Sequence, residues 1–182
     1  KAISDFCKKV GIFIFTEQIK DTVPTLVAIG ENINITNFCS CNNAIGALKP
    51  FDYKTHSDHR TVEFSDHKHG GKEAIFSQTN ETTKAYDKSK EILNRAETTK
   101  EKEIAELIKA GRYQIDGKLA TEILRIEITA KTERKIRSKF KPYLGGLSPT
   151  FANLFKVDLW KQVLKDEMNK VFNHPLQRII FL

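Results

Sequence analysis

The segment TTKAYDKSKE, residues 82–91, places a tyrosine between two lysines at a spacing of two. On a β-strand, side chains two residues apart share a face, so Lys84, Tyr86 and Lys88 would point the same way. Neighbouring ammonium groups favour the phenolate and also attract phosphate. Such a tyrosine could attack a phosphodiester and keep the bond energy in a phosphotyrosine for later rejoining. The alternative is a strand tyrosine that only packs.

Phosphoryl transfer also needs charge stabilisation at the phosphate oxygens, commonly from a divalent cation held by carboxylates or imidazoles. The segment LRIEI, residues 124–128, reads as a strand with an apolar inner face, which puts Arg125 and Glu127 on the other face. Arg125 could bind a phosphate through two hydrogen bonds, and Glu127 is the best-placed carboxylate for a metal. A surface Arg and Glu pair without a ligand is the alternative.

The segment HKHGG brings two further metal-binding side chains close together. On a strand, His67 and His69 would share a face, as in enzymes that pair a His-hydrophobe-His strand with a downstream tyrosine. Here Lys68 is the middle residue and two glycines follow, which favours a hairpin loop. Both metal ligation and an exposed polar loop stay open as interpretations.

Charge is unevenly distributed in this chain of 182 residues, whose formal net charge is +7. The segment KTERKIRSKFK, residues 131–141, holds six basic residues and one acid. A local cationic patch favours a polyanionic partner, most often nucleic acid, and a solvated helix face is the alternative. The side chains predicted to contact DNA are Lys84, Lys131, Arg134, Lys135, Arg137 and Lys139.

Composition is that of a soluble globular protein, with 40% hydrophobic and 29% charged residues. The apolar runs are too short to span a bilayer, and no signal peptide is expected from the first residues. The start at Lys1 without a methionine is consistent with a fragment. Three cysteines form no disulfide framework and indicate the cytosol, where we expect them to be buried and apolar.

We expect an α+β domain: an antiparallel sheet that carries Tyr86 and Glu127, packed by helices, with a helical C-terminal part. GIFIF, TLVAIG, NINITNFCSCNN, TVEFSD and EAIFSQ are expected strands, and EAIFSQ should form a hairpin with TTKAYDK. A helix should follow Lys88, with Thr98 and Glu101 as a capping box and Gly111 as a stop. The segment GKLATEILRIEITA should be a strand, and the basic segment should be a helix. We assign residues 1–145 to the main domain and 146–182 to a helical C-terminal part.

Taken together, KAYDKSKE followed by a helix, LRIEI, a basic helix and the TFANLF helix resembles the rolling-circle replication initiators of phages and plasmids. The filamentous-phage gene II endonuclease family has the most similar segment order. The resemblance covers about residues 60–170. Relatives have a glutamate near the position of Glu91 and a strand of the pattern Leu-x-Arg-hydrophobe-Glu.

This resemblance implies a site-specific nickase that works with Mg²⁺ or Mn²⁺ on single-stranded DNA or an origin hairpin. Tyr86 would be the nucleophile that keeps the 5′ phosphate, with Lys88 and Arg125 supporting that phosphate. The implied metal ligands are Glu127, Glu91, His67 and His69. Such a protein would work in the cytoplasm of a bacterial host, away from any membrane, with host replication proteins as further partners.

One departure from the family keeps other interpretations open. Relatives often carry an Arg-x-Asp strand upstream of the tyrosine, whereas ITNFCSC has Asn37 and Cys39 at the matching positions. A degenerate initiator, or a DNA-binding module without catalysis, would account for this difference. A plasmid mobilisation relaxase would differ from an initiator mainly in its biological context.

Overall fold

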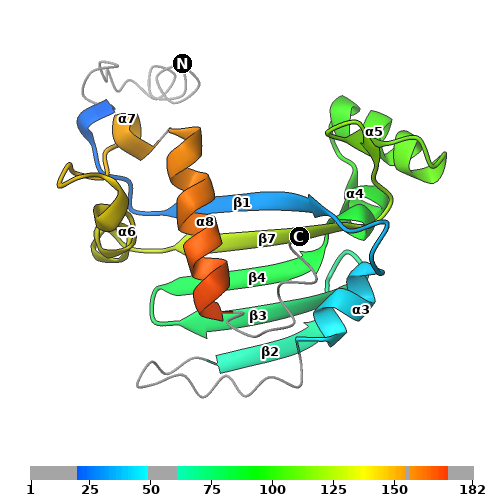
Figure 1. The fold of residues 1–182 in the computed structure, drawn as a ribbon, viewed down its shortest axis with the longest axis horizontal. Coiled ribbons are helices and arrows are strands. Elements are labelled where there is room, and N and C mark those ends of the chain that lie inside the picture. The colour runs from blue at the N-terminus through cyan, green and yellow to red at the C-terminus, as the bar shows by residue number, and fades with distance from the viewer. Residues whose placement is uncertain (1–19, 49–60, 155, 172–182) are drawn as a thin grey trace.

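The computed structural model describes residues 20–48, 61–154 and 156–171. Its centre is a five-stranded antiparallel sheet with the strand order β1-β7-β4-β3-β2 (Figure 1). The strands of this sheet are β1 (Val27–Asn34), β2 (Thr61–Asp66), β3 (Lys72–Gln78), β4 (Glu81–Asp87) and β7 (Ile123–Ala130). A separate two-stranded hairpin joins β5 (Gln114–Ile115) to β6 (Lys118–Leu119).

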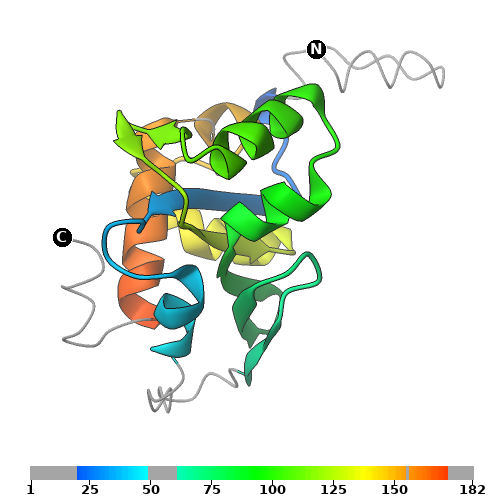
Figure 2. The same cartoon turned by 90° about the vertical axis from the view of Figure 1, so that its right-hand side faces the viewer.

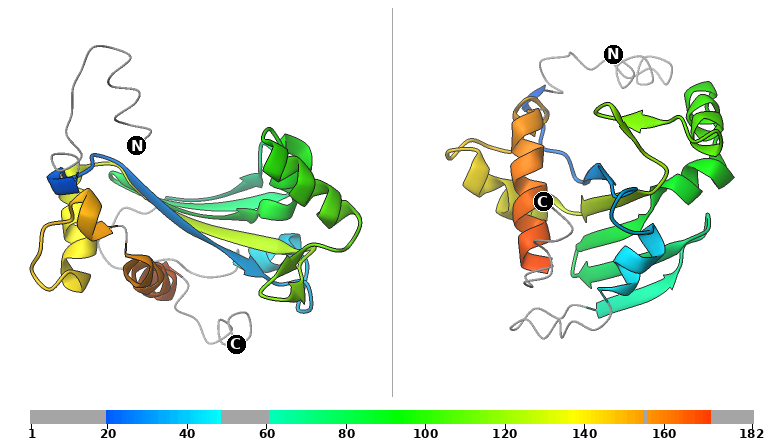
Figure 3. Two further views of the ribbon diagram at one scale, coloured as in Figure 1. Left: turned by 90° about the horizontal axis from the view of Figure 1, so that it is seen from above. Right: turned by 45° about the vertical axis from the view of Figure 1, so that its right-hand side comes forward.

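Helices lie on both faces of the sheet but cover them unequally. The helices are α3 (Cys41–Gly46), α4 (Lys88–Arg95), α5 (Thr99–Lys109), α6 (Glu133–Phe140), α7 (Phe151–Leu154) and α8 (Val157–Val171), with a 3₁₀ turn at Lys141–Tyr143. Helices α3 and α8 lie on one face, whereas α4 and α5 lie on the other, at one end of the strands (Figures 2 and 3). The described helices leave the rest of that second face uncovered.

The covered face forms two apolar cores. Ala85 and Ile126 from the central strands pack with Cys41 and Ile45 of α3. Farther along the sheet, Ile128 packs with residues of α6 and α8. A third cluster joins α4 and α5 to Ile123 at the start of β7, on the opposite face. Among the described residues, the sheet thus has one packed face and one largely open face, which leaves room for polar chemistry on the open side.

Most expected elements are present. The α+β class is confirmed, as is the hairpin in which β3 pairs with β4. Thr98 and Glu101 form the predicted capping box at the start of α5, and Gly111 follows the end of that helix with a φ of 62°. On β7, Leu124, Ile126 and Ile128 are all buried, as the alternation predicted. The GIFIF segment lies outside the described residues.

One expected strand was wrong. The TLVAIG and NINITNFCSCNN segments do not form two strands, because β1 runs continuously from Val27 to Asn34 and then ends. The chain turns, and Ser40 accepts a hydrogen bond from the backbone N–H of Asn43, which caps α3. The CSC segment therefore lies at a helix start and not on a strand. Both Cys39 and Cys41 are free thiols, and Cys41 is fully buried.

A buried ionic network ties the sheet to the helices beside it. The ammonium of Lys139 on α6 lies 2.6 Å from a carboxylate oxygen of Glu81 and 2.7 Å from one of Glu167. Lys135, one turn earlier, lies 3.3 Å from the other Glu81 oxygen. Both glutamates are at most 5% exposed, so Lys139 supplies charge that these carboxylates need in order to be buried.

Removing this cation should destabilise the fold strongly. We expect Lys139→Met to lower the free energy of unfolding by about 3 to 5 kcal/mol, because it leaves two buried carboxylates with less compensation. Arg134→Met is the matched control, since it removes an exposed charge from the same helix and should change stability by about 0.5 kcal/mol or less. Urea denaturation measures both. Equal losses in the two variants would contradict the network's importance.

The same network should make stability sensitive to acid. Burial alone would raise the pKa of Glu81, but its hydrogen bond to Lys139 and the lysine charges outweigh burial and leave the pKa below its ordinary value of 4.5. The unfolded chain therefore binds this proton more tightly, so the contribution is present above pH 4.5 and is lost as pH falls through the lowered pKa. We expect wild-type stability to fall more steeply below pH 4.5 than that of Glu81→Gln. Denaturation at a series of pH values tests this, and parallel curves would refute it.

Candidate functional site

Two rows of side chains cross the open face of the sheet. Residues directly opposite each other in antiparallel strands point to the same face. One row contains Asn32, Arg125, Tyr86 and Glu73, and the next contains Gly30, Glu127, Lys84 and Ile75. Pairing of β4 with β7 thus places Tyr86 beside Arg125, and Lys84 beside Glu127. The predicted nucleophile and the predicted carboxylate lie on one face.

Tyr86 lies at the end of β4 and is only 7% exposed. Its ring stacks on the imidazole of His67, with the ring centroids 4.8 Å apart and the planes 6° from parallel. His67 belongs to the turn between β2 and β3, so this turn covers one face of the phenol ring. The tyrosine is therefore buried, even though it belongs to the open side of the sheet.

The phenol is held in its protonated form. Burial is the largest contribution that raises the pKa of Tyr86, and the negative charge of Glu91 adds to it. The Arg125 charge opposes the shift, whereas Glu127 and the hydrogen bond to Glu91 reinforce it. The expectation that flanking lysines favour the phenolate was wrong in this respect, because burial and carboxylates dominate. A proton acceptor must accompany any attack by this oxygen.

Glu91 lies one turn into α4 and faces the phenol. Burial alone would raise its pKa, but its hydrogen bond to Lys88 and the Lys88 charge outweigh burial and lower it. The Lys88 ammonium lies 2.7 Å from a Glu91 oxygen, and Arg95 contacts the other oxygen at 3.4 Å. Glu91 therefore stays ionised near neutral pH and can accept a proton from Tyr86.

Arg125 is positioned by three neighbours from two strands. Its Nε lies 3.2 Å from the Glu127 carboxylate, and its Nη1 donates a hydrogen bond of 3.1 Å to Asn32. Gly30 lies beneath it, where a Cβ atom would come within 2.8 Å of the guanidinium. Glycine at this position thus gives the guanidinium room to lie flat across β1, and about a quarter of the Arg125 side chain is exposed.

The two histidines occupy a tight turn, as expected, and their ring centroids lie 5.4 Å apart. Burial is the main cause that lowers the pKa of His67, partly offset by Glu73 and Glu91. The turn is tied to α4 because Asn94 donates a hydrogen bond of 2.6 Å to the carbonyl of His69. Near neutral pH His67 is therefore a neutral ring that covers Tyr86.

The four predicted metal ligands do not form one site. Within the described residues, no three of His67, His69, Glu91 and Glu127 bring ligand atoms as close together as ligands of one ion must lie. Glu91 is paired with Lys88, and Glu127 is paired with Arg125. The donor set thus does not fit a preformed Mg²⁺ or Mn²⁺ centre, and we assign no step of the chemistry to a metal there.

The basic helix does not present all its cations to solvent. Lys139 is enclosed by Glu81 and Glu167, which removes it from the predicted DNA-binding surface, and Lys135 is partly engaged by the same network. Arg137 pairs with Glu133 at 2.8 Å on the helix surface. Lys131 and Arg134 are exposed, and neither forms an ion pair with another described residue. The exposed part of this helix is therefore less cationic than its composition predicted.

Comparisons with protein-family models, curated proteins and solved structures found no match to this chain. The assignment of chemistry rests on the residues themselves. Among the described residues, no helix combines the length and apolar character needed to cross a bilayer.

The environment of Tyr86 predicts how its phenol should titrate. We expect the pKa of Tyr86 to lie above the ordinary value of 10 and to fall in Glu91→Gln, because that variant removes the negative charge but leaves the burial. Ultraviolet titration of each protein, corrected by the corresponding Tyr86→Phe protein, measures this. An unchanged pKa in Glu91→Gln would show that the carboxylate does not act on the phenol.

The stacked imidazole predicts a second effect. We expect His67→Ala to increase the rate at which tetranitromethane nitrates Tyr86, since the covering ring is removed. Lys68→Ala is the matched control in the same turn and should leave the rate unchanged. Mass spectrometry of the tyrosine-containing peptides measures the product. Equal rates in the two variants would argue against His67 as the cover.

Proposed function

We propose that this protein nicks one strand of DNA at a specific site through a covalent phosphotyrosine intermediate and later rejoins it, as a replication initiator does. The observation that carries the proposal is the placement of Tyr86 beside Arg125 and Glu91 on the open face of the sheet. These three side chains supply a nucleophile, a phosphate-binding cation and a proton acceptor. The resemblance of the KAYDKSKE and LRIEI segments to replication initiators supports the same chemistry.

In the proposed step, the Tyr86 hydroxyl oxygen attacks the phosphorus atom of a phosphodiester. A bond forms between that oxygen and phosphorus while the bond from phosphorus to the 3′ oxygen breaks. The phenolic proton passes to the ionised Glu91 carboxylate, and the departing 3′ oxygen takes a proton from water. The 5′ phosphate stays on Tyr86, and attack by a 3′ hydroxyl reverses the step.

Arg125 and Lys88 stabilise the charge that develops on the phosphate. Arg125 is held by Asn32 and Glu127, so its guanidinium is oriented before DNA arrives. Lys88 is the first residue of α4 and neutralises Glu91 in the free protein. Lys84, in the adjacent row, extends the cationic path along β4. Access to Tyr86 requires the His67 turn to move aside, because the phenol is only 7% exposed.

A trapping experiment tests the proposal without knowledge of the origin. The protein is incubated with a labelled pool of single-stranded oligonucleotides with a randomised centre, with and without Mg²⁺ or Mn²⁺. We expect a DNA adduct that survives denaturing electrophoresis, with the DNA attached to the Tyr86 peptide. Tyr86→Phe should form none, whereas Tyr113→Phe, the matched tyrosine control, should react normally.

Glu91→Gln tests the proton acceptor in the same assay. General bases typically contribute at least about 100-fold in rate, so we expect adduct formation to slow by about that factor. DNA binding by this variant, measured by fluorescence anisotropy, should change much less than the rate. A loss of binding that matches the loss of rate would assign Glu91 to DNA contact instead.

A DNA-binding module without catalysis is the alternative function. The exposed cations Lys131 and Arg134 favour it, since phosphate contacts alone give binding with steep salt dependence and little sequence preference. Salt-sensitive binding of the oligonucleotide pool, with no adduct under any metal condition, would support this alternative over the nickase.

A further inference from the structure

We propose that Cys41, Asp87 and Glu122 form a binding site for a thiophilic divalent metal ion of the zinc class, on the packed face of the sheet. The three side chains come from separate parts of the chain: the start of α3, the junction of β4 with α4, and the residue before β7. One ligand atom from each lies within 4.8 Å of the others. None of these three residues is among the four metal ligands that the sequence predicted.

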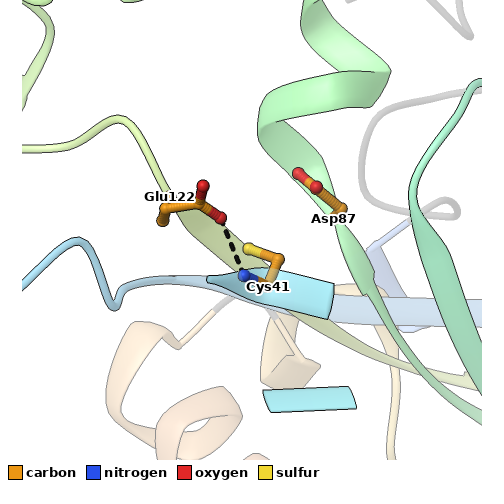
Figure 4. Close-up of side chains that lie close together, drawn as sticks. All are labelled: Cys41, Asp87 and Glu122. Carbon is orange, nitrogen blue, oxygen red and sulfur yellow. Dashed lines mark hydrogen bonds between the residues drawn. The ribbon is translucent and has the colours of Figure 1, made fainter. Parts of the chain in front are cut away.

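Two of the three ligands are buried, and both carboxylates are held by hydrogen bonds. Cys41 is fully buried and Asp87 is 2% exposed, whereas Glu122 is half-buried. The Cys41 thiol points into the gap between the two carboxylates (Figure 4). Glu122 accepts a hydrogen bond of 2.7 Å from the backbone N–H of Cys41, and Asp87 accepts one of 3.0 Å from that of Lys90. Each carboxylate is thus oriented by the backbone, as ligands of structural metals commonly are.

Charge balance also points to a cation. Within the described part of the chain, neither Asp87 nor Glu122 forms an ion pair with a lysine or arginine. In contrast, the buried carboxylates of Glu81 and Glu167 share Lys139, and that of Glu91 pairs with Lys88. Burial is the main cause that raises the pKa values of Cys41 and Asp87, and the neighbouring acids add to it; at Asp87 the backbone N–H and the charge of Lys90 partly offset the shift.

The donor set selects the kind of metal. A thiolate with two carboxylates suits Zn²⁺ or its spectroscopic substitute Co²⁺, whereas Mg²⁺ prefers oxygen ligands alone. Three protein ligands leave a fourth tetrahedral position for water. Metal binding displaces the thiol proton, which relieves the crowding of acids in the site.

Such an ion would fasten the strand that carries the tyrosine. Asp87 directly follows Tyr86 and points to the opposite face, because successive strand residues alternate. Asp87 also caps α4, which carries Glu91 and Lys88. A metal held between Asp87, Cys41 and Glu122 would therefore fix the junction from behind the open face.

Cobalt titration of the full chain, after removal of metal with a chelator, tests the proposal. We expect one equivalent of Co²⁺ to give a near-ultraviolet band from thiolate-to-cobalt charge transfer, and Zn²⁺ to abolish it by displacement. Cys41→Ser should lose the band, whereas Cys39→Ser and Cys7→Ser should keep it. Zn²⁺ should also raise the Tm of the wild type but not that of Glu122→Gln, which covers the case in which Cys41→Ser does not fold.

The absence of a charge-transfer band and of a Tm shift in the wild type would overturn the proposal. A band that follows Cys39 or Cys7 instead of Cys41 would overturn it as well. Tyr86→Phe should bind cobalt normally, so this result is independent of DNA cleavage. A protein that binds no metal would not contradict the proposed nicking function. A protein that forms no DNA adduct would not contradict the proposed metal site.

Discussion

The alternation of side chains along β4 is the constraint on which the site depends. Neighbouring residues must point to opposite faces, so one face of β4 can pack while the other carries polar groups. Ala85 is fully buried beneath α3, and Tyr86 next to it faces the open side. Pairing with β7 then fixes which side chain lies beside the tyrosine, and the register selects Arg125. A shift of one residue in the pairing register of a strand would move all its side chains to the opposite face of the sheet.

The direct passage from β4 to α4 adds a second constraint. Asp87 is both the last residue of the strand and the cap of the helix, so no loop separates them. The helix therefore begins at the edge of the open face and brings Glu91 back toward Tyr86 within one turn. A rigid connection of this kind holds two interacting groups more closely than a flexible loop would.

Local patterns predicted the strands and helices well because those patterns report burial. The alternation in LRIEI and the capping box at Thr98 are decided within a few residues, and both are found in the structure. The strand prediction for the CSC segment was wrong because Ser40 caps a helix, and the spacing of apolar residues in a short segment does not reveal such a cap.

The site was only partly predictable, since several of its contacts join segments far apart in the sequence. Nothing local indicated that Cys41 would meet Glu122, or that Lys139 would be enclosed by Glu81 and Glu167. The raised pKa of Tyr86 also depends on burial by the His67 turn, whereas the sequence showed only the flanking lysines. Spacing predicted correctly that Tyr86 and the Arg125 strand have polar side chains on one face, but it did not reveal the electrostatic balance around the tyrosine.

The position of β7 has a consequence for how the chain assembles. This strand lies between β1 and β4, yet it is the last of the five in sequence. Val27 must wait for Ala130 before it can pair, and the same strand completes the free edge of β4. During synthesis, two strand edges therefore remain without their partner until late, a state that favours slow folding and unwanted association with other chains. When β7 inserts, it pairs with the edges of β1 and β4 together, and the same event places Arg125 beside Tyr86.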